Sequence, residues 1–187
     1  YVNESNEMNN WVSVALAVSA PSQPDLVITS GTPTLTPAAA LAGEEVQLSA
    51  WTVKNQGTMD SGTFLNGYYL STDATITAAD TLLVSNSNSS LAVGASKVWG
   101  AQMLTVPSGT VPGNYYLGVL VDFVNSVTES NEDNNFVSVA FAVSEQPDLV
   151  ISSGTPILTP SIVAPGEEVT LSAWTVKNQG TVDISTS

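Results

Sequence analysis

The chain contains no cysteine and no histidine, and its 187 residues hold 3 basic residues, all lysines, against 17 acidic residues. The missing cysteine and histidine exclude disulfide scaffolds, thiol catalysis, zinc sites built from those ligands and histidine-based catalytic triads. A formal net charge of −14 repels the phosphates of nucleic acids and anionic lipid surfaces. We therefore expect no nucleic-acid partner.

Long hydrophobic runs are also missing. The longest, near Tyr115–Val121 and Phe136–Val143, have the length of a strand and fall far below the roughly 18 apolar residues of a membrane-spanning helix. We therefore expect no membrane insertion by this segment. Hydrophobic residues nevertheless make up 43% and the mean hydropathy is +0.17, which excludes a disordered acidic tail.

The most informative feature that is present is internal repetition. Gln23–Asp60 returns as Gln146–Asp183, 123 residues later and identical at most positions, including the strings QPDLVI and LSAWTVKNQGT. The string ESNEMNN near the start returns as ESNEDNN from Glu129, and Val12–Ser19 matches Val137–Ser144. We interpret the chain as a window on tandem repeats of about 123 residues. Residues 1–20 are then the C-terminal strand of a preceding repeat, 21–145 a complete unit, and 146–187 the first two strands of a following repeat.

The pattern within the complete unit predicts an all-β fold. Val137, Val139, Phe141 and Val143 alternate with small residues, which is typical of a strand with one buried face. Clusters of Gly, Pro, Asn and Ser separate similar segments. Seven short strands in one unit favour an immunoglobulin-like Greek-key sandwich. We expect strands at Asp25–Leu35, Glu45–Asn55, Phe64–Thr72, Thr81–Ser85, Lys97–Val106, Tyr115–Asp122 and Phe136–Val143.

Five strings in this order resemble a known family. They are DLVI from Asp25, VKNQGT from Val53, YLSTDATITAADTLL from Tyr69, PGNYYLGVLVD from Pro112 and ESNEDNN from Glu129. Together they resemble CARDB, the cell adhesion related domain found in bacteria. The resemblance implies a seven-stranded immunoglobulin-like sandwich, used in tandem on large secreted or surface-anchored proteins. It implies an extracellular or cell-surface location and brings no catalytic residues, so we do not expect an enzyme.

Most acidic residues fall in the loops between the predicted strands. The loop from Asp73 to Asp80 offers two carboxylates and the hydroxyl of Thr75, the oxygen ligands that calcium prefers. The alternative is that Asp73 and Thr75 form a turn closed by the aspartate side chain. The acidic ends of successive domains would repel each other. Calcium bound in such loops would reduce this repulsion and so stiffen the junctions between domains.

A second oxygen-rich group lies before the last predicted strand of the unit. Asp122, Glu129 and Glu132, with neighbouring asparagines, are further candidate calcium ligands. The alternative is again a capped turn, in which these side chains bind backbone amides.

Other binding chemistries remain weaker alternatives. Six aromatic residues could stack on a sugar, although large aromatics in strands usually fill the core. Lys54 could form an isopeptide bond with Asn135 or Glu129, or lie on the surface beside acids. Asn3 and Asn88 stand in glycosylation sequons. The aromatic residues are Trp51, Tyr68, Tyr69, Trp99, Tyr115 and Tyr116.

These observations predict a structural repeat of an extracellular filament or surface stalk, with domains joined head to tail. The alternative is an adhesin or a carbohydrate- or protein-binding module of a large secreted protein. The flanking segments Trp11–Val18, Asp148–Leu158 and Glu167–Asn178 are predicted strands that have too few partners to bury an apolar face. We expect neighbouring repeats or copies of the chain to complete them. A surface glycan or protein is a possible further partner, while the number of repeats stays open.

Overall fold

The computed structural model describes residues 2–3, 5–6, 8–9, 11–180 and 182–183. These residues form strands and turns only, so the predicted all-β class is confirmed, and no helix in the described part could span a membrane. The strands are β1 (Leu26–Ile28), β2 (Leu35–Thr36), β3 (Ala39–Ala40), β4 (Glu45–Leu48), β5 (Trp51–Asn55), β6 (Phe64–Ser71), β7 (Thr81–Asn88), β8 (Ser96–Trp99), β9 (Gln102–Thr105), β10 (Gly113–Val121), β11 (Phe136–Val143), β12 (Leu149–Ile151), β13 (Leu158–Thr159), β14 (Thr170–Leu171) and β15 (Val176–Asn178).

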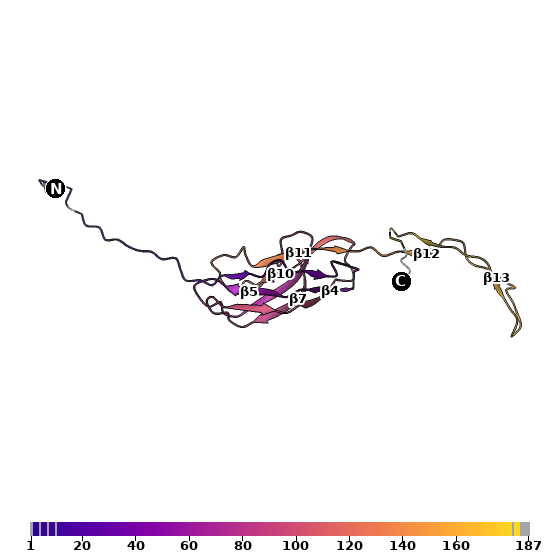
Figure 1. The fold of residues 1–187 in the computed structure, drawn as a ribbon. Coiled ribbons are helices and arrows are strands. Elements are labelled where there is room, and N and C mark those ends of the chain that lie inside the picture. The colour runs from indigo at the N-terminus through magenta and orange to yellow at the C-terminus, as the bar shows by residue number, and fades with distance from the viewer. Residues whose placement is uncertain (1, 4, 7, 10, 181, 184–187) are drawn as a thin grey trace.

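The longest strands build one five-stranded sheet in the order β3-β11-β10-β6-β7 (Figure 1). All its pairs are antiparallel except β3 with β11, where Ala39 and Ala40 run parallel to Ala142 and Val143. The predicted strand at 136–143 has the bounds of β11, and β6, β7 and β10 differ from prediction by a few residues at their ends.

The facing layer consists of two three-stranded ladders, β1-β5-β8 and β2-β4-β9. Three long strands of the prediction, 25–35, 45–55 and 97–106, each occur here as two shorter ones. Serine hydroxyls occupy the interruption: Ser30 Oγ accepts the amide of Thr52, and Ser49 Oγ accepts the amide of Thr34, both at 2.9 Å. At both breaks a serine hydroxyl thus takes the place of a backbone carbonyl as hydrogen-bond acceptor. The prediction of continuous strands at 25–35 and 45–55 is therefore wrong.

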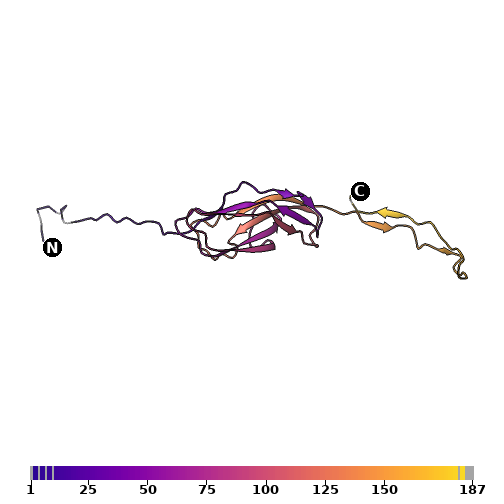
Figure 2. The same cartoon turned by 60° about the horizontal axis from the view of Figure 1, so that its bottom comes forward.

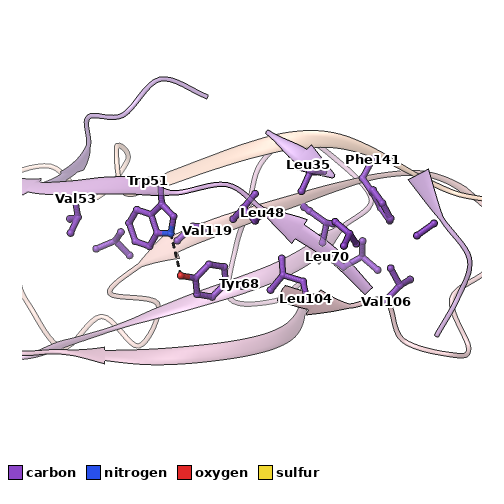
Figure 3. Close-up of a cluster of buried hydrophobic side chains, with 14 of the residues drawn as sticks. Leu35, Leu48, Trp51, Val53, Tyr68, Leu70, Leu104, Val106, Val119 and Phe141 are labelled. Carbon is purple, nitrogen blue, oxygen red and sulfur yellow. Dashed lines mark hydrogen bonds between the residues drawn. The ribbon is translucent and has the colours of Figure 1, made fainter. Parts of the chain in front are cut away.

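The core lies between these two layers, and Figure 3 shows its main side chains. Trp51 is its largest fully buried side chain; its Nε1 donates to the hydroxyl of Tyr68 at 3.2 Å, and its ring stacks on Trp99 at 6.0 Å between centroids. Tyr68 meets Trp51 edge-on, at an interplanar angle of 74°. Such aromatic pairs add about 0.5–1.5 kcal/mol to the stability that burial provides.

The loop between β6 and β7 is held down by a close approach at Gly118. A Cβ on Gly118 would lie 2.5 Å from Cγ1 of Ile76 and would also clash with the carbonyl oxygen of Val137. Ile76 is buried over this glycine, and the hydroxyl of Ser138 donates to the carbonyl of Ala74 at 2.7 Å. The loop is therefore fixed by packing.

The segment before the unit contains no strand among its described residues. Trp11–Val18, predicted as a strand, is exposed and unpaired in the structure, because a single extended segment without a neighbouring strand has no ladder to join. Figures 1 and 2 show it leading away from the folded unit as an extended chain.

The segment after the unit forms two short ladders, β12 with β15 and β13 with β14. The strands predicted at 148–158 and 167–178 are therefore shorter than expected. Leu149 pairs with Asn178 and Leu158 with Leu171, as Leu26 pairs with Asn55 and Leu35 with Leu48 in the complete unit. The register is thus preserved after a displacement of 123 residues, as the repeat in the sequence requires.

Candidate functional site

The loops gather at the two ends of the folded unit. The entry end, formed by residues 55–63, 89–95 and 122–135, holds the incoming chain: the amide of Thr58 donates to the carbonyl of Gln23 at 2.8 Å. The exit end is formed by residues 41–44, 72–80 and 107–111, and there the amide of Ser144 donates to the carbonyl of Ala40 at 2.9 Å. Acidic residues lie at both ends.

The exit end carries the first predicted calcium ligands. Asp73 Oδ1 accepts the amide of Thr75 at 2.8 Å, and Asp80 Oδ2 accepts the amide and the hydroxyl of Thr77 at 2.7 and 3.0 Å. Both carboxylates thus close turns of their own loop, as the alternative to calcium binding proposed. Asp80 also lines an open hollow of about 540 Å³ with Pro107 and Tyr115.

The entry end carries the second predicted set, and its carboxylates also cap backbone. Asp122 accepts the amide of Val127 at 2.7 Å and the hydroxyl of Ser126 at 2.7 Å. Glu132 Oε1 accepts the amide of Glu129 at 2.8 Å. Asp122 sits at φ 49°, a left-handed conformation that aspartate tolerates better than most residues.

Neither set is assembled as a metal centre. Within the part of the chain that the structure describes, no three acidic side chains come together in a group that could hold a metal ion. Asp73, Thr75 and Asp80 share one loop, and Asp122, Glu129 and Glu132 share another, but each carboxylate has a backbone or side-chain donor of its own. Calcium binding at these residues stays a prediction.

Two of the acids, Asp122 and Glu129, are buried, each at 5% exposed, and Glu129 is the one that contacts the incoming chain. Its Oε2 accepts the amide of Leu26, the first residue of β1, and its Oε1 accepts Nδ2 of Asn135 at 2.9 Å. The pKa of Glu129 is raised to about 7, chiefly by burial and also by the charges of Glu132 and Asp122, against the two hydrogen bonds that lower it. Glu129 therefore ties the start of the domain to the loop before β11.

A second tie, which the sequence analysis missed, is Asn55 at the end of β5. Its side chain is fully buried and makes four hydrogen bonds. Oδ1 accepts the amides of Asp25 and Gly57 at 3.2 and 3.0 Å, and Nδ2 donates to the carbonyls of Met59 and Leu91 at 2.8 and 2.9 Å. Asn55 thus joins two loops, residues 55–63 and 89–95, to the incoming chain.

The signal for this tie was in the repeated string VKNQGT. Asn178 occupies the same place in the second occurrence of this string and accepts the amides of Asp148 and Gly180, both at 3.0 Å. We name the contacts of Asn55 and Glu129 with the incoming chain the entry clamp. Gly57 belongs to it, because a Cβ there would collide with the carbonyl oxygen of Gln23.

The other candidate chemistries find little support in the geometry. Lys54 lies between the buried Val53 and Asn55 on β5, so its side chain leaves the opposite face of the sheet, away from Glu129 and Asn135. That placement does not suit an isopeptide bond.

The structure also argues against glycosylation at Asn88 and against a sugar platform built from the buried aromatic residues. Asn88 is buried, which does not suit a glycosylation acceptor, while Asn3 is exposed. Trp51, Tyr68 and Tyr69 are buried, as a core role requires, and therefore offer no platform for a sugar.

The comparisons with known proteins address the family. The CARDB family model matches residues 23–139, which is more than half of the chain. The chain belongs to the CARDB family. No curated protein matches the sequence significantly.

Several solved structures are similar to this chain. A CARDB domain from Pyrococcus furiosus, crystallised with di-metal ions, is 22% identical with a TM-score of 0.47, and the match covers 67% of this chain and 97% of that one. A domain of a protein assigned to the cell surface of Methanosarcina acetivorans is 25% identical with a TM-score of 0.41, over 66% and 95% of the two chains. Beta-glucosidase 3B from Thermotoga neapolitana matches over 65% of this chain but 16% of its own length, at 14% identity and a TM-score of 0.41.

Proposed function

We propose that this CARDB unit is a structural repeat of an extracellular filament or surface stalk, built from seven-stranded immunoglobulin-like sandwiches joined head to tail. The single observation that carries the proposal is a second copy of the asparagine half of the entry clamp. Asn178, Gln179 and Asp148 repeat the hydrogen bonds of Asn55, Gln56 and Asp25. The same hydrogen bonds between a linker and the end of a strand therefore occur twice in one chain, as an array of repeats requires.

The seven-strand description is supported when consecutive strands of the two three-stranded ladders are counted as one interrupted strand each. β1 with β2, β4 with β5, and β8 with β9 make three strands, while β6, β7, β10 and β11 make four. The short β3 covers part of the outer edge of β11.

The entry clamp supports a fixed angle between successive units. The incoming chain is held by Thr58 at Gln23, by Ser130 at Pro24 and by Glu129 at Leu26. Pro21 and Pro24 restrict the backbone of the linker itself. A unit held this close to its linker transmits its orientation to its neighbour.

The test is small-angle X-ray scattering of a chain with two complete repeats. A stalk predicts a maximum dimension close to that of two units placed end to end, with little flexibility. Replacing Asn55 by Ala in the second unit should increase flexibility there. A scattering curve of two freely jointed units in the unmodified chain would contradict the proposal.

We further propose that calcium binds at the acidic loops and stiffens the junctions. The support is chemical: Asp73, Thr75 and Asp80 bring carboxylate and hydroxyl oxygens into one exposed loop beside the exit end. The scattering measurement repeated with calcium and with chelator tests this part separately. If the maximum dimension and the melting temperature are the same with calcium and with chelator, the calcium proposal is wrong. The proposal of a structural stalk does not depend on that result.

A further inference from the structure

The stretch of chain between β11 and β12 is held at both of its ends (Figure 1). At its start, the amide of Ser144 donates to the carbonyl of Ala40 at the exit end, at 2.9 Å. On its other side, a Cβ on Gly180 would lie 3.0 Å from the carbonyl oxygen of Gln146, so these two residues pack closely. Only Glu145 lies between the two held residues of the stretch. Because two residues of extended chain span at most about 7 Å, the exit end and the loop that contains Gly180 stay close together.

The part of the exit end that lies beside this stretch carries no charge. The ladder of β10 and β11 ends at the pair Gly113 and Val143, so the same register places Val111 opposite Glu145, two positions beyond that pair. We name residues 107–112, of sequence PSGTVP, the exit tip. It holds no acidic residue, although the chain has 17. The exit tip can therefore be covered by protein without the cost of burying a charge.

The loop on the other side of the stretch is uncharged as well. In the complete unit, the amide of Thr58 donates to the carbonyl of Gln23, and Met59 is the next residue. We name residues 56–59, of sequence QGTM, the entry tip, which returns as QGTV at 179–182. The last residue of the entry tip thus stays apolar, as methionine in the first occurrence and valine in the second.

We propose that the exit tip of one unit packs directly on the entry tip of the repeat that follows it, with Val111 against the apolar residue that ends the entry tip. This inference rests on the proposed function as an array, and it names the surfaces that meet at each junction. The partner is the adjoining repeat of the same chain, because the short stretch between the held residues keeps both tips beside it. Neither Val111 nor Met59 belongs to the core cluster of the unit, and their burial at the junction supplies the attraction.

The contact between the tips differs from the entry clamp in what it joins. The clamp binds the incoming chain to its own unit and is present in a single unit. The tip contact joins two units, so a single unit cannot form it. A substitution in the exit tip should therefore leave a single unit unchanged and act only when a second unit follows.

The experiment compares the thermal unfolding of residues 21–145 with that of a longer chain in which residues 23–145 follow once more. Glu145 then precedes Gln23 of the second copy as it precedes Gln146 in the sequence. Every residue of the core cluster lies within 21–145, so we expect this single unit to fold. The chain of two units should melt about 3 °C higher or more, because the tip contact exists only there.

Val111→Asp in the first copy should remove this gain, since it places a charge in the contact. In the single unit the same substitution should leave the melting temperature nearly unchanged, because Val111 is 70% exposed. Val98→Asp is the matched control: Val98 is also 70% exposed but lies on β8 opposite Thr52, outside both tips, so the gain should remain. Met59→Asp in the second copy should also remove the gain, and should cost nothing more when combined with Val111→Asp.

Small-angle scattering of the same chains separates this inference from the proposed function. A two-unit chain that is extended and rigid, but keeps its melting temperature with Val111→Asp, overturns the tip contact and leaves the stalk, whose stiffness then comes from the entry clamp. A two-unit chain that scatters as freely jointed units contradicts the stalk itself, and the tip contact with it. A single unit that melts lower with Val111→Asp also overturns the inference, because the valine then acts within its own unit.

Discussion

Glu129→Gln is the sharpest test of the entry clamp. The carboxyl of Glu129 is buried, and its pKa is raised to about 7 from the ordinary 4.5, chiefly by burial. The folded state therefore holds a proton that the unfolded state releases between these two values. A difference of about 2.5 pKa units at about 1.36 kcal/mol each corresponds to about 3 kcal/mol.

The sign follows from the raised pKa. The stability associated with Glu129 is fully present below pH 4.5 and is lost as the pH rises toward the folded-state pKa of about 7. The glutamine introduced by Glu129→Gln has no such proton to lose. Its Oε1 can still accept the amide of Leu26, and its Nε2 can donate to Oδ1 of Asn135, which is buried without a partner, once that amide turns over.

The assay is urea unfolding between pH 4.5 and 8, followed by tryptophan fluorescence, which changes as the buried Trp51 becomes exposed. We expect the unmodified chain to lose about 3 kcal/mol more than Glu129→Gln over this range, so that the variant is the more stable at pH 8. Asp133→Asn is the control, because Asp133 is an exposed acid of the same loop. Equal pH slopes for Glu129→Gln and the unmodified chain would refute the assignment of the buried proton to Glu129.

Three further substitutions probe packing and metal binding. Gly118→Ala should destabilise the unit by about 1–3 kcal/mol in thermal unfolding, since the new Cβ clashes with Val137 and Ile76; an unchanged melting temperature would contradict the close packing of that loop. Asn55→Ala should cost about 3 kcal/mol, because it leaves the part-buried amides of Asp25 and Gly57 and the carbonyls of Met59 and Leu91 without partners, and urea unfolding measures the loss. If calcium binds at the loop of residues 73–80, Asp80→Ala should remove the rise in melting temperature that calcium produces; a full rise in the variant would place the ion elsewhere.

Much of the fold could be predicted from local patterns. β11 alternates apolar and small residues along its whole length, and its bounds were predicted correctly because alternation is a property of the strand itself. The breaks between β1 and β2 or between β4 and β5 were missed. They depend on the hydroxyls of Ser30 and Ser49 meeting amides 15 or more residues away in the chain, which no local pattern records.

The candidate site could likewise be predicted only where it depends on local sequence. The positions of Asp73, Asp80, Asp122 and Glu132 in loops were clear from the sequence, but their roles as caps depend on backbone geometry. Asn55 was overlooked because its place at the end of a predicted strand shows nothing of the loops it contacts. Its burial between two loops and the incoming chain arises only when the domain closes.

The sequence by itself determined the all-β class, the family and the 123-residue repeat, because composition, alternation and recurring strings are written along the chain. Only the tertiary structure decided which acid has a strongly raised pKa, namely Glu129. Glu129 and Glu132 stand three residues apart in one loop, yet one is buried against Leu26 and the other lies exposed. The physical reason is that a carboxyl pKa is set by solvent, charges and donors around it, and these come from strands distant in sequence.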